Sequence, residues 1–265
     1  MTAGQPGRGG ALPPRGGRAA RHYPGEGCQP PGAGGPAGRA GPGEGAMTVD
    51  AEAEKDVAAR AAAGLVEDGM TVGLGTGTTV AYLLPALARR RLSVRCVSTS
   101  PRTEAAAIRA GLRTERFEGV GRFDIAIDGA DQVTPDGWLV KGGGGAHTRE
   151  KIVAAAADRF VVIVDSTKAV PALHSPVPLE LLEFGLSSTL RRIGPVTIRD
   201  APRSPDGGVI ADYTGEFTDP AALASMLSAA PGVVEHGLFP PRLTWAVVLG
   251  RGQSAEQVMI GAAAR

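Results

Sequence analysis

Four short apolar runs alternate with helical segments between residues 50 and 170, and this alternation restricts the fold more than any other sequence feature. The runs lie in "MTVGLGTGTT" (70–79), "SVRCVSTS" (93–100), "FDIAIDGAD" (123–131) and "FVVIVDSTK" (160–168). Strands that alternate with helices form a mostly parallel sheet with helices on both faces. The sequence therefore predicts an α/β fold with a Rossmann-like, mostly parallel sheet.

Helices are expected near 51–67, 80–91 and 148–159, where apolar residues recur with helical spacing. Asp50 can cap the first helix, and Gly69 is expected to close it. Pro85 is expected to kink the second helix or to delay its start.

The pattern changes after about residue 175. "SPVPLELLEFG" (175–185) contains two prolines, and after it we expect a helix near 184–193, strands at 196–199 and 208–213, and a helix near 219–230. The apolar run "TWAVVLG" (244–250) then resumes the strand pattern. This order predicts a smaller α+β domain at 177–245, inserted into a catalytic α/β domain formed by residues 47–176 and 246–265.

The first 46 residues have a different composition, with fifteen glycines and eight prolines. Such a segment cannot bury enough apolar surface to fold, so we expect a disordered Pro/Gly-rich extension, and it carries no targeting signature. Two interpretations stay open: Met47 is the true start of the protein, or the segment is a real flexible tail.

The chain has 265 residues, is 43% hydrophobic and has a formal net charge of +1. A nearly neutral protein has no electrostatic reason to bind nucleic acid or an anionic membrane. No apolar run is long enough to cross a bilayer, and the two cysteines, Cys28 and Cys96, make no disulfide framework. We expect a cytoplasmic protein that binds neither nucleic acid nor membranes.

Residues suited to chemistry follow the predicted strands, in the stretches 75–79, 128–131, 141–145 and 165–168. Because the carboxyl ends of parallel strands meet at one edge of a sheet, we expect these stretches to form one site. The third of them lies in "KGGGGAHTREK" (141–151), where four consecutive glycines indicate positive φ angles or a backbone in close contact with a ligand.

Each stretch also has a plainer interpretation. The turn "GLGTGTT" can bind phosphate at a helix N-terminus, but it can be a tight turn alone, and it fits neither a dinucleotide motif nor a P-loop. "DGAD" can be an ordinary Asp-Gly turn, Lys141 and Lys168 can be surface lysines, and Glu150 can stabilise the first turn of its helix. Together, these residues favour proton transfer next to a carbonyl, which needs a base and a cation beside the enediolate oxygen.

The same stretches resemble a known family. "VGLGTGTTVAYLL", "DIAIDGADQV", "LVKGGGGAHTREKI" and "FVVIVDSTK", in this order, are similar to ribose-5-phosphate isomerase of the A type, and "PGVVEHGLF" (231–239) is similar to its second domain. The resemblance covers residues 47–265. It implies an aldose-ketose isomerase of the pentose phosphate pathway that interconverts D-ribose 5-phosphate and D-ribulose 5-phosphate through a cis-enediolate. It also implies a homodimer or homotetramer that uses no metal or other cofactor.

The resemblance further implies roles for individual residues. Glu150 matches the general base, Lys141 matches the lysine that stabilises the enediolate, and Asp128 and Asp131 match carboxylates that contact sugar hydroxyls and assist ring opening. The implied substrate-binding residues are Thr76, Gly77, Thr78, Thr79, Asp128, Gly129, Ala130, Asp131, Lys141, Gly142, Gly143, Gly144 and Lys168, together with Lys55, which can reach the phosphate. No metal ligands are expected, because the four histidines form no ligand spacing.

Three positions depart from the family pattern. Gln132 stands where the family commonly has Glu, and Gly145 and His147 stand where Ala and an apolar residue are more frequent. We expect His147 to be packed or exposed rather than catalytic. The protonation state of Glu150 stays open, because a helix N-terminus and lysines favour its charged form whereas burial and aspartates oppose it.

Two other functions are compatible with parts of the pattern. A non-enzymatic sugar-phosphate sensor of the same fold would carry a DNA-binding helical module, which the Pro/Gly-rich segment cannot form. A nucleotide-cofactor transferase would need an acidic residue at the end of the second strand, where this chain has "CVSTS".

Overall fold

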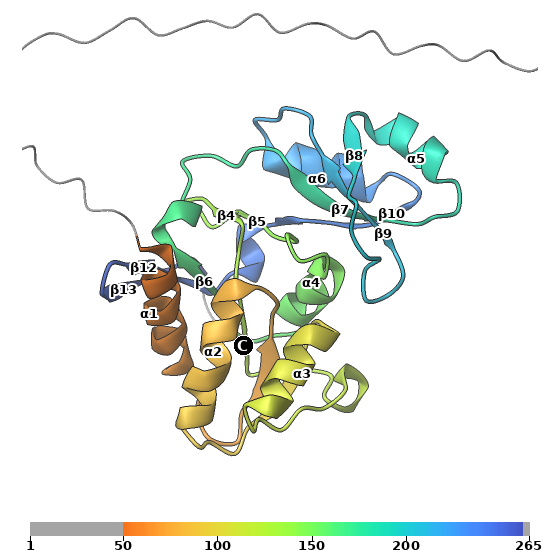
Figure 1. Ribbon diagram of the computed structural model, residues 1–265. Coiled ribbons are helices and arrows are strands. Elements are labelled where there is room, and N and C mark those ends of the chain that lie inside the picture. The colour runs from red at the N-terminus through yellow and green to blue at the C-terminus, as the bar shows by residue number, and fades with distance from the viewer. Residues whose placement is uncertain (1–49, 262–265) are drawn as a thin grey trace, which may run out of the picture. The chain divides into compact units, whose positions relative to one another are not determined.

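The computed structural model describes residues 50–261, and its central feature is a six-stranded sheet (Figure 1). The strand order is β13 (Ser254–Met259), β12 (Ala246–Arg251), β6 (Phe160–Asp165), β3 (Ile125–Asp128), β1 (Thr71–Leu74) and β2 (Arg95–Ser98). Every neighbouring pair is parallel except β12 and β13. The predicted mostly parallel sheet is confirmed, while the predicted extension at 1–46 and a start at Met47 lie outside the described residues.

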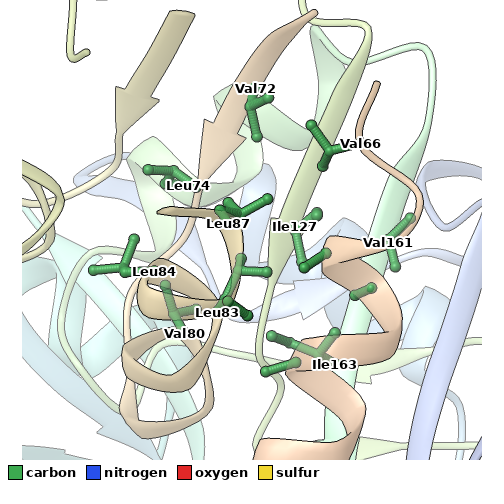
Figure 2. Packing of buried hydrophobic residues seen from close by; sticks show 14 of the residues in the cluster. Val66, Val72, Leu74, Val80, Leu83, Leu84, Leu87, Ile127, Val161 and Ile163 are labelled. Carbon is green, nitrogen blue, oxygen red and sulfur yellow. The ribbon is translucent and has the colours of Figure 1, made fainter. Parts of the chain in front are cut away.

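Helices lie on both faces of this sheet. Helices α1 (Ala51–Ala63), α2 (Thr78–Arg89) and α3 (Pro101–Arg109) contribute to the core on one face, and α4 (His147–Ala155) contributes to the core on the other. Successive strand residues point to opposite faces. Leu74, for example, packs with α1 and α2, whereas a Cβ on Gly73 would lie 2.5 Å from Val153 of α4. Figure 2 shows the first of these cores, where side chains of α2 pack with those of β1, β3 and β6.

Two smaller antiparallel sheets complete the described structure. The first has the order β11 (Leu238–Phe239), β5 (Leu139–Val140) and β4 (Gln132–Val133). The second has the order β10 (Val233–His236), β7 (Val177–Leu181), β9 (Val209–Tyr213) and β8 (Val196–Ile198), and it packs with α5 (Leu186–Ile193) and α6 (Pro220–Ser228). Short 3-10 turns lie at η1 (Phe117–Gly119), η2 (Ser166–Lys168) and η3 (Pro241–Leu243). The boundaries of a domain at 177–245 stay a prediction, because β11 lies inside that range and pairs with β5 outside it.

Several element predictions needed correction. Asp50 caps α1 as predicted, accepting a hydrogen bond from Ala53 N at 3.1 Å, but the helix ends at Ala63, where the weak helix former Gly64 follows. Helix α2 begins at Thr78, so Pro85 does not delay its start. Helix α3 and strands β7 and β13 were not predicted from the sequence. Prolines argue against a central strand, yet "SPVPLELLEFG" forms one in the second small sheet.

The order of the strands determines where a ligand can bind. From β1 the chain crosses to β2 on one side and then returns to β3 on the other side of β1. Such a reversal makes a topological switch point, where the loops after the two strands separate and leave room for a ligand. The loops at this switch point are 75–79 and 128–131, two of the four stretches singled out in the sequence.

Candidate active site

The turn after β1 is built around the carboxylate of Asp128. Thr76 N and Gly129 N donate to Asp128 Oδ1 at 3.0 and 2.7 Å. A Cβ on Gly75 would lie only 1.8 Å from Asp128 Cγ. The first glycine of the turn is therefore required because the carboxylate packs directly against the backbone.

The same turn leads into the N-terminus of α2. Gly77 is the N-cap residue with a φ of 131°, which side-chain-bearing residues rarely adopt, and no side chain caps the helix. The first N–H groups of a helix lack partners within the helix, and they bind anions together with the helix dipole. Gly77 and Thr78 are exposed, so this end of α2 is available to a phosphate.

Three charged side chains form a buried cluster beside this turn. Lys141 Nζ lies 2.8 Å from Asp128 Oδ2 and 3.1 Å from Glu150 Oε2, and it donates to Gly129 O at 2.6 Å. The exposed fractions of Lys141, Asp128 and Glu150 are 2%, 3% and 3%. The cluster thus holds two carboxyl groups and one ammonium group away from water.

The cluster shifts the pKa of each of its members. Burial opposes the charge of Lys141, but Asp128 and Glu150 outweigh it and raise the lysine pKa above its usual range. Burial raises the pKa of Asp128, although Lys141 and the N–H groups of Gly129 and Thr76 oppose this shift. Burial, followed by repulsion from Asp128, raises the pKa of Glu150 to about 8. A carboxyl group with a pKa near neutrality is suited to taking and returning a proton.

The glycine loop lies next to both strand-end turns. Gly142 and Gly145 have φ angles of 112° and 71°, so two of the four glycines are required by the backbone conformation. Gly143 N donates to Asp131 Oδ2 at 2.9 Å, and a Cβ on Gly144 would lie 3.2 Å from Thr76 Cγ2. The loop follows β5 of a small antiparallel sheet and not, as the sequence had predicted, a strand of the parallel sheet, yet it lies beside the turns at 75–79 and 128–131 as expected.

At the candidate site, a buried charged cluster lies beside exposed loops. The charged cluster is almost inaccessible, whereas Asp131, Gly143 and Gly144 are exposed. A cavity of about 400 Å³ lies elsewhere, beside α6 and β10, and none of the predicted site residues lines it. A ligand at the candidate site would therefore lie against the exposed loops.

The other two predicted lysines are not part of the buried charged cluster. Lys168 is in η2, after β6, and has no ion-pair or hydrogen-bond partner among residues 50–261. Lys55 lies on α1, where it donates to Glu52 Oε1 at 2.6 Å. Ala130 and Thr79 belong to the two turns at the switch point. The structure therefore brings the two turns, Lys141, the glycine loop and Glu150 together, while Lys55 is engaged with a neighbour on its own helix.

Two of the positions that depart from the family pattern, Gln132 and His147, are buried. Gln132 accepts from His174 N at 2.9 Å and donates to His174 O at 2.8 Å, so it anchors a distant segment. The ring of His147 is fully buried, and neither ring nitrogen has a hydrogen-bond partner among the described residues. Burial lowers the pKa of His147 to about 4, so the ring is neutral at neutral pH.

Three polar residues contact stretches of the predicted site but were not predicted from the sequence. Arg199, from the loop after β8, donates to Gly142 O and Gly143 O at 3.0 and 3.1 Å. Thr99 Oγ1 lies 2.9 Å from Thr76 Oγ1. Glu54 accepts from Ser166 N and Gly252 N, each at 2.8 Å. Only Thr99 had a local signal, its place at a strand end, because the other two act on residues remote in the sequence.

Known proteins match this chain in sequence and in overall fold. Residues 95–254 match the model of the family described as ribose 5-phosphate isomerase A (phosphoriboisomerase A). A ribose-5-phosphate isomerase A from Methanosarcina acetivorans is 46% identical over 202 residues, which cover 70% of this chain and 86% of the relative.

Solved structures agree with this result. The crystal structure of ribose 5 phosphate isomerase A from Neisseria gonorrhoeae superposes with a TM-score of 0.77 at 30% identity, covering 80% of this chain and 99% of that chain. A D-ribose-5-phosphate isomerase in complex with phospho-erythronic acid has a TM-score of 0.74 at 31% identity, covering 79% of this chain and 99% of that chain.

Proposed function

This chain belongs to the ribose-5-phosphate isomerase A family and is an aldose-ketose isomerase acting on ribose 5-phosphate and ribulose 5-phosphate, and we propose that Glu150 is its base. The observation that carries the proposal is the position of Lys141 Nζ, within 3.1 Å of Glu150 and 2.8 Å of Asp128. A base and a cation are thereby held side by side, as proton transfer next to a carbonyl requires.

The proposed step moves one proton between neighbouring carbons. The Glu150 carboxylate takes the proton from C2 of open-chain ribose 5-phosphate, and the electron pair of that bond forms the C1–C2 double bond of a cis-enediolate with the charge on O1. Lys141 stabilises this oxygen. Glu150 then returns the proton to C1 while the O2 proton moves to O1, which gives ribulose 5-phosphate. Asp128 and Asp131 hold sugar hydroxyls and assist ring opening.

The phosphate is proposed to bind at the N-terminus of α2. Support comes from its uncapped first turn and from the exposure of Gly77 and Thr78. Thr76, Thr79 and the 129–130 backbone complete this side, and the glycine loop contacts the sugar. Lys168 and Lys55 are proposed to contribute positive charge toward the phosphate, and Lys55 would have to leave Glu52 to do so.

The reaction is proposed to need no metal ion. Lys141 supplies a cation between the two carboxyl groups, where a metal would otherwise neutralise the developing charge. Among residues 50–261, His, Cys, Asp and Glu side chains form no group of three or more that could hold a metal ion.

The wider setting is also proposed. We place the enzyme in the cytoplasm, in the non-oxidative branch of the pentose phosphate pathway, as a homodimer or homotetramer. Exposed apolar side chains at Leu182, Phe184 and Val234 support self-association, since Phe184 is 94% exposed. No helix within the described residues has the length and apolar character needed to span a membrane. Light scattering after size-exclusion chromatography would give the oligomeric state.

The test compares the wild type with Glu150→Gln in the isomerisation of ribose 5-phosphate, with and without EDTA. Removing a general base is expected to lower kcat by about 100- to 10,000-fold. For the wild type, kcat/KM is expected to rise with pH up to about 8, because only ionised Glu150 accepts the proton and its pKa is raised to about 8. Binding of phospho-erythronic acid should be retained in the variant.

Each part of this experiment has a result that would contradict the proposed function. Loss of wild-type turnover in EDTA would contradict the metal-free reaction. A Glu150→Gln variant that turns over normally would show that another group is the base. Wild-type protein that binds the sugar phosphate without converting it would point to the sensor instead.

A further inference from the structure

The guanidinium group of Arg199 joins the second small sheet to the glycine loop. Arg199 Nη1 donates to Gly142 O at 3.0 Å and to Gly143 O at 3.1 Å. Its Nε and Nη2 atoms donate to the two carboxylate oxygens of Asp212, at 2.7 and 2.6 Å. One side chain from the loop after β8 therefore contacts two successive carbonyls of the loop that follows Lys141.

The guanidinium group of Arg199 is held in a fixed orientation by Asp212 on the neighbouring strand. Strands β8 and β9 pair in the register Thr197↔Asp212 and Ile198↔Ala211, and Arg199 N donates to Ile210 O at 3.0 Å. The backbone pairing thus places the carboxylate of Asp212 beside Arg199. A two-pronged Arg–carboxylate pair has a fixed planar geometry, so it orients the remaining N–H groups toward the loop.

The glycine loop needs such an external anchor. Four consecutive glycines lose more backbone freedom on ordering than any other residues, and they bring no side chains to hold themselves in place. Among the described residues, the loop backbone makes few other hydrogen bonds: Lys141 N to Gly237 O, Gly143 N to Asp131 Oδ2 and Gly145 N to Gly142 O. Within residues 50–261, Arg199 is the side chain that binds carbonyl groups of this loop.

Anchoring the carbonyls also directs the N–H groups. In a trans peptide the C=O of one residue points opposite to the N–H of the next. With Gly142 O and Gly143 O on Arg199, the N–H groups of Gly143 and Gly144 point away from it. Gly143 N donates to Asp131, whereas Gly144 N has no acceptor among the described residues. Gly144 lies beside Thr76, in the turn assigned to the substrate.

We propose that Arg199, braced by Asp212, is a positioning residue for the isomerisation. It holds the carbonyls of Gly142 and Gly143 so that the N–H of Gly144 faces a substrate oxygen and Lys141 stays in place beside Glu150. Arg199 itself does not touch the reacting carbons. This inference rests on the proposed function of Lys141 and Glu150.

The experiment compares Arg199→Ala and Arg199→Lys with a matched control, Arg149→Ala. Arg149 also makes a two-pronged pair, with Asp206 at 2.8 and 2.6 Å in the segment that joins β8 to β9, but its guanidinium group does not contact the glycine loop. Steady-state kinetics, thermal unfolding and binding of phospho-erythronic acid would be measured for each variant, with the wild type and Glu150→Gln in the same series.

Arg199→Ala is expected to lose about 10- to 100-fold in kcat, with a smaller change in KM, because a misplaced catalytic group slows the reaction without abolishing binding. Arg199→Lys should lie between this variant and the wild type, since a lysine cannot bind Asp212 and both carbonyls at once. Methylguanidinium in solution should restore part of the kcat of Arg199→Ala. Arg149→Ala should keep kcat within about twofold of the wild type and gain nothing from the added cation.

Normal kcat in folded Arg199→Ala would overturn the proposal, and so would an equal loss in Arg149→Ala. If Arg199→Ala does not fold, Arg199→Lys decides, and wild-type kcat in that variant would refute the positioning role. Failure of the proposed function is distinguishable, because it would show as absent turnover in the wild type or normal turnover in Glu150→Gln.

Discussion

At the scale of single residues, Glu150 shows how position changes chemistry. Its helix N-terminus and Lys141 favour the charged form, but burial and Asp128 favour the protonated form, and the outcome is a pKa raised to about 8. Glu54 is buried too, yet burial is outweighed there by the N–H groups of Gly252 and Ser166, and its pKa is lowered. The two glutamates therefore differ because one meets a carboxylate and the other meets backbone donors.

This difference predicts how stability depends on pH. The folded-state pKa of Glu150 is above its ordinary value of 4.5, so its contribution to stability is complete below pH 4.5 and is lost as pH rises toward 8. Glu150→Gln removes this titration. As the pH rises from 5 to 8, the free energy of unfolding of the variant is expected to increase relative to that of the wild type, on the order of a few kcal/mol in total. Urea unfolding at each pH measures this difference.

Glu54→Gln is the matched control with the opposite sign. Because the Glu54 pKa is lowered, the contribution of its carboxylate is present above pH 4.5 and is lost as pH falls through the lowered value. Glu54→Gln should therefore be less stable than the wild type at neutral pH. The difference in unfolding free energy between the two proteins should become smaller as the pH is lowered. Parallel pH profiles for the two variants would contradict the assigned causes.

At the scale of elements, the proposed phosphate site lies at the N-terminus of α2. The helix begins directly after the turn that packs on Asp128, and the topology places this start at the switch point between β1 and β3. Gly77 makes the entry possible through its φ of 131°. A short turn, a free helix N-terminus and a carboxylate from the neighbouring strand are thereby combined within a few residues.

We predict that Gly77→Ala raises the KM for ribose 5-phosphate about tenfold or more, because the strained backbone would move the N–H groups away from the phosphate. Gly111→Ala is the control: Gly111 also has a positive φ, 84°, and has open space around it, but it lies beyond the C-terminus of α3. Both variants should lose about 1 kcal/mol of stability, and only the first should change KM. Equal KM values in the two variants would show that the phosphate does not bind at this turn.

At the scale of the whole molecule, the glycine loop depends on sheets that are remote in the sequence. Lys141 N donates to Gly237 O at 2.8 Å, beside the pairing of β5 with β11, and Arg199 reaches the same loop from the second small sheet. The backbone of Lys141 is thus held by the segment at Gly237, and the carbonyls of Gly142 and Gly143 are held by Arg199. The 177–245 region contributes these anchors besides its own core.

Every residue with a proposed role lies within residues 50–261. A protein that starts at Met47 is therefore expected to match the full chain in kcat/KM and in thermal midpoint, measured side by side by the isomerase assay and circular dichroism. A clear rise in KM on truncation would instead assign a binding role to residues 1–46.

The sequence by itself determined what depends on neighbours along the chain. Apolar runs with helices between them specified the parallel sheet, Asp50 marked the start of α1, and glycines and carboxylates at strand ends marked the turns at 75–79 and 128–131. These features could be predicted because strand alternation, helix capping and turn formation are local properties of the backbone.

The tertiary structure alone decided what depends on residues far apart in the sequence. It showed that β7 is a central strand despite its proline, that the glycine loop follows an antiparallel sheet, and that Arg199 binds carbonyls 56 and 57 residues away. It also decided the pKa of Glu150. Strand pairing, burial and contacts between charges depend on which segments the fold brings together. Local sequence patterns do not determine which distant segments come into contact.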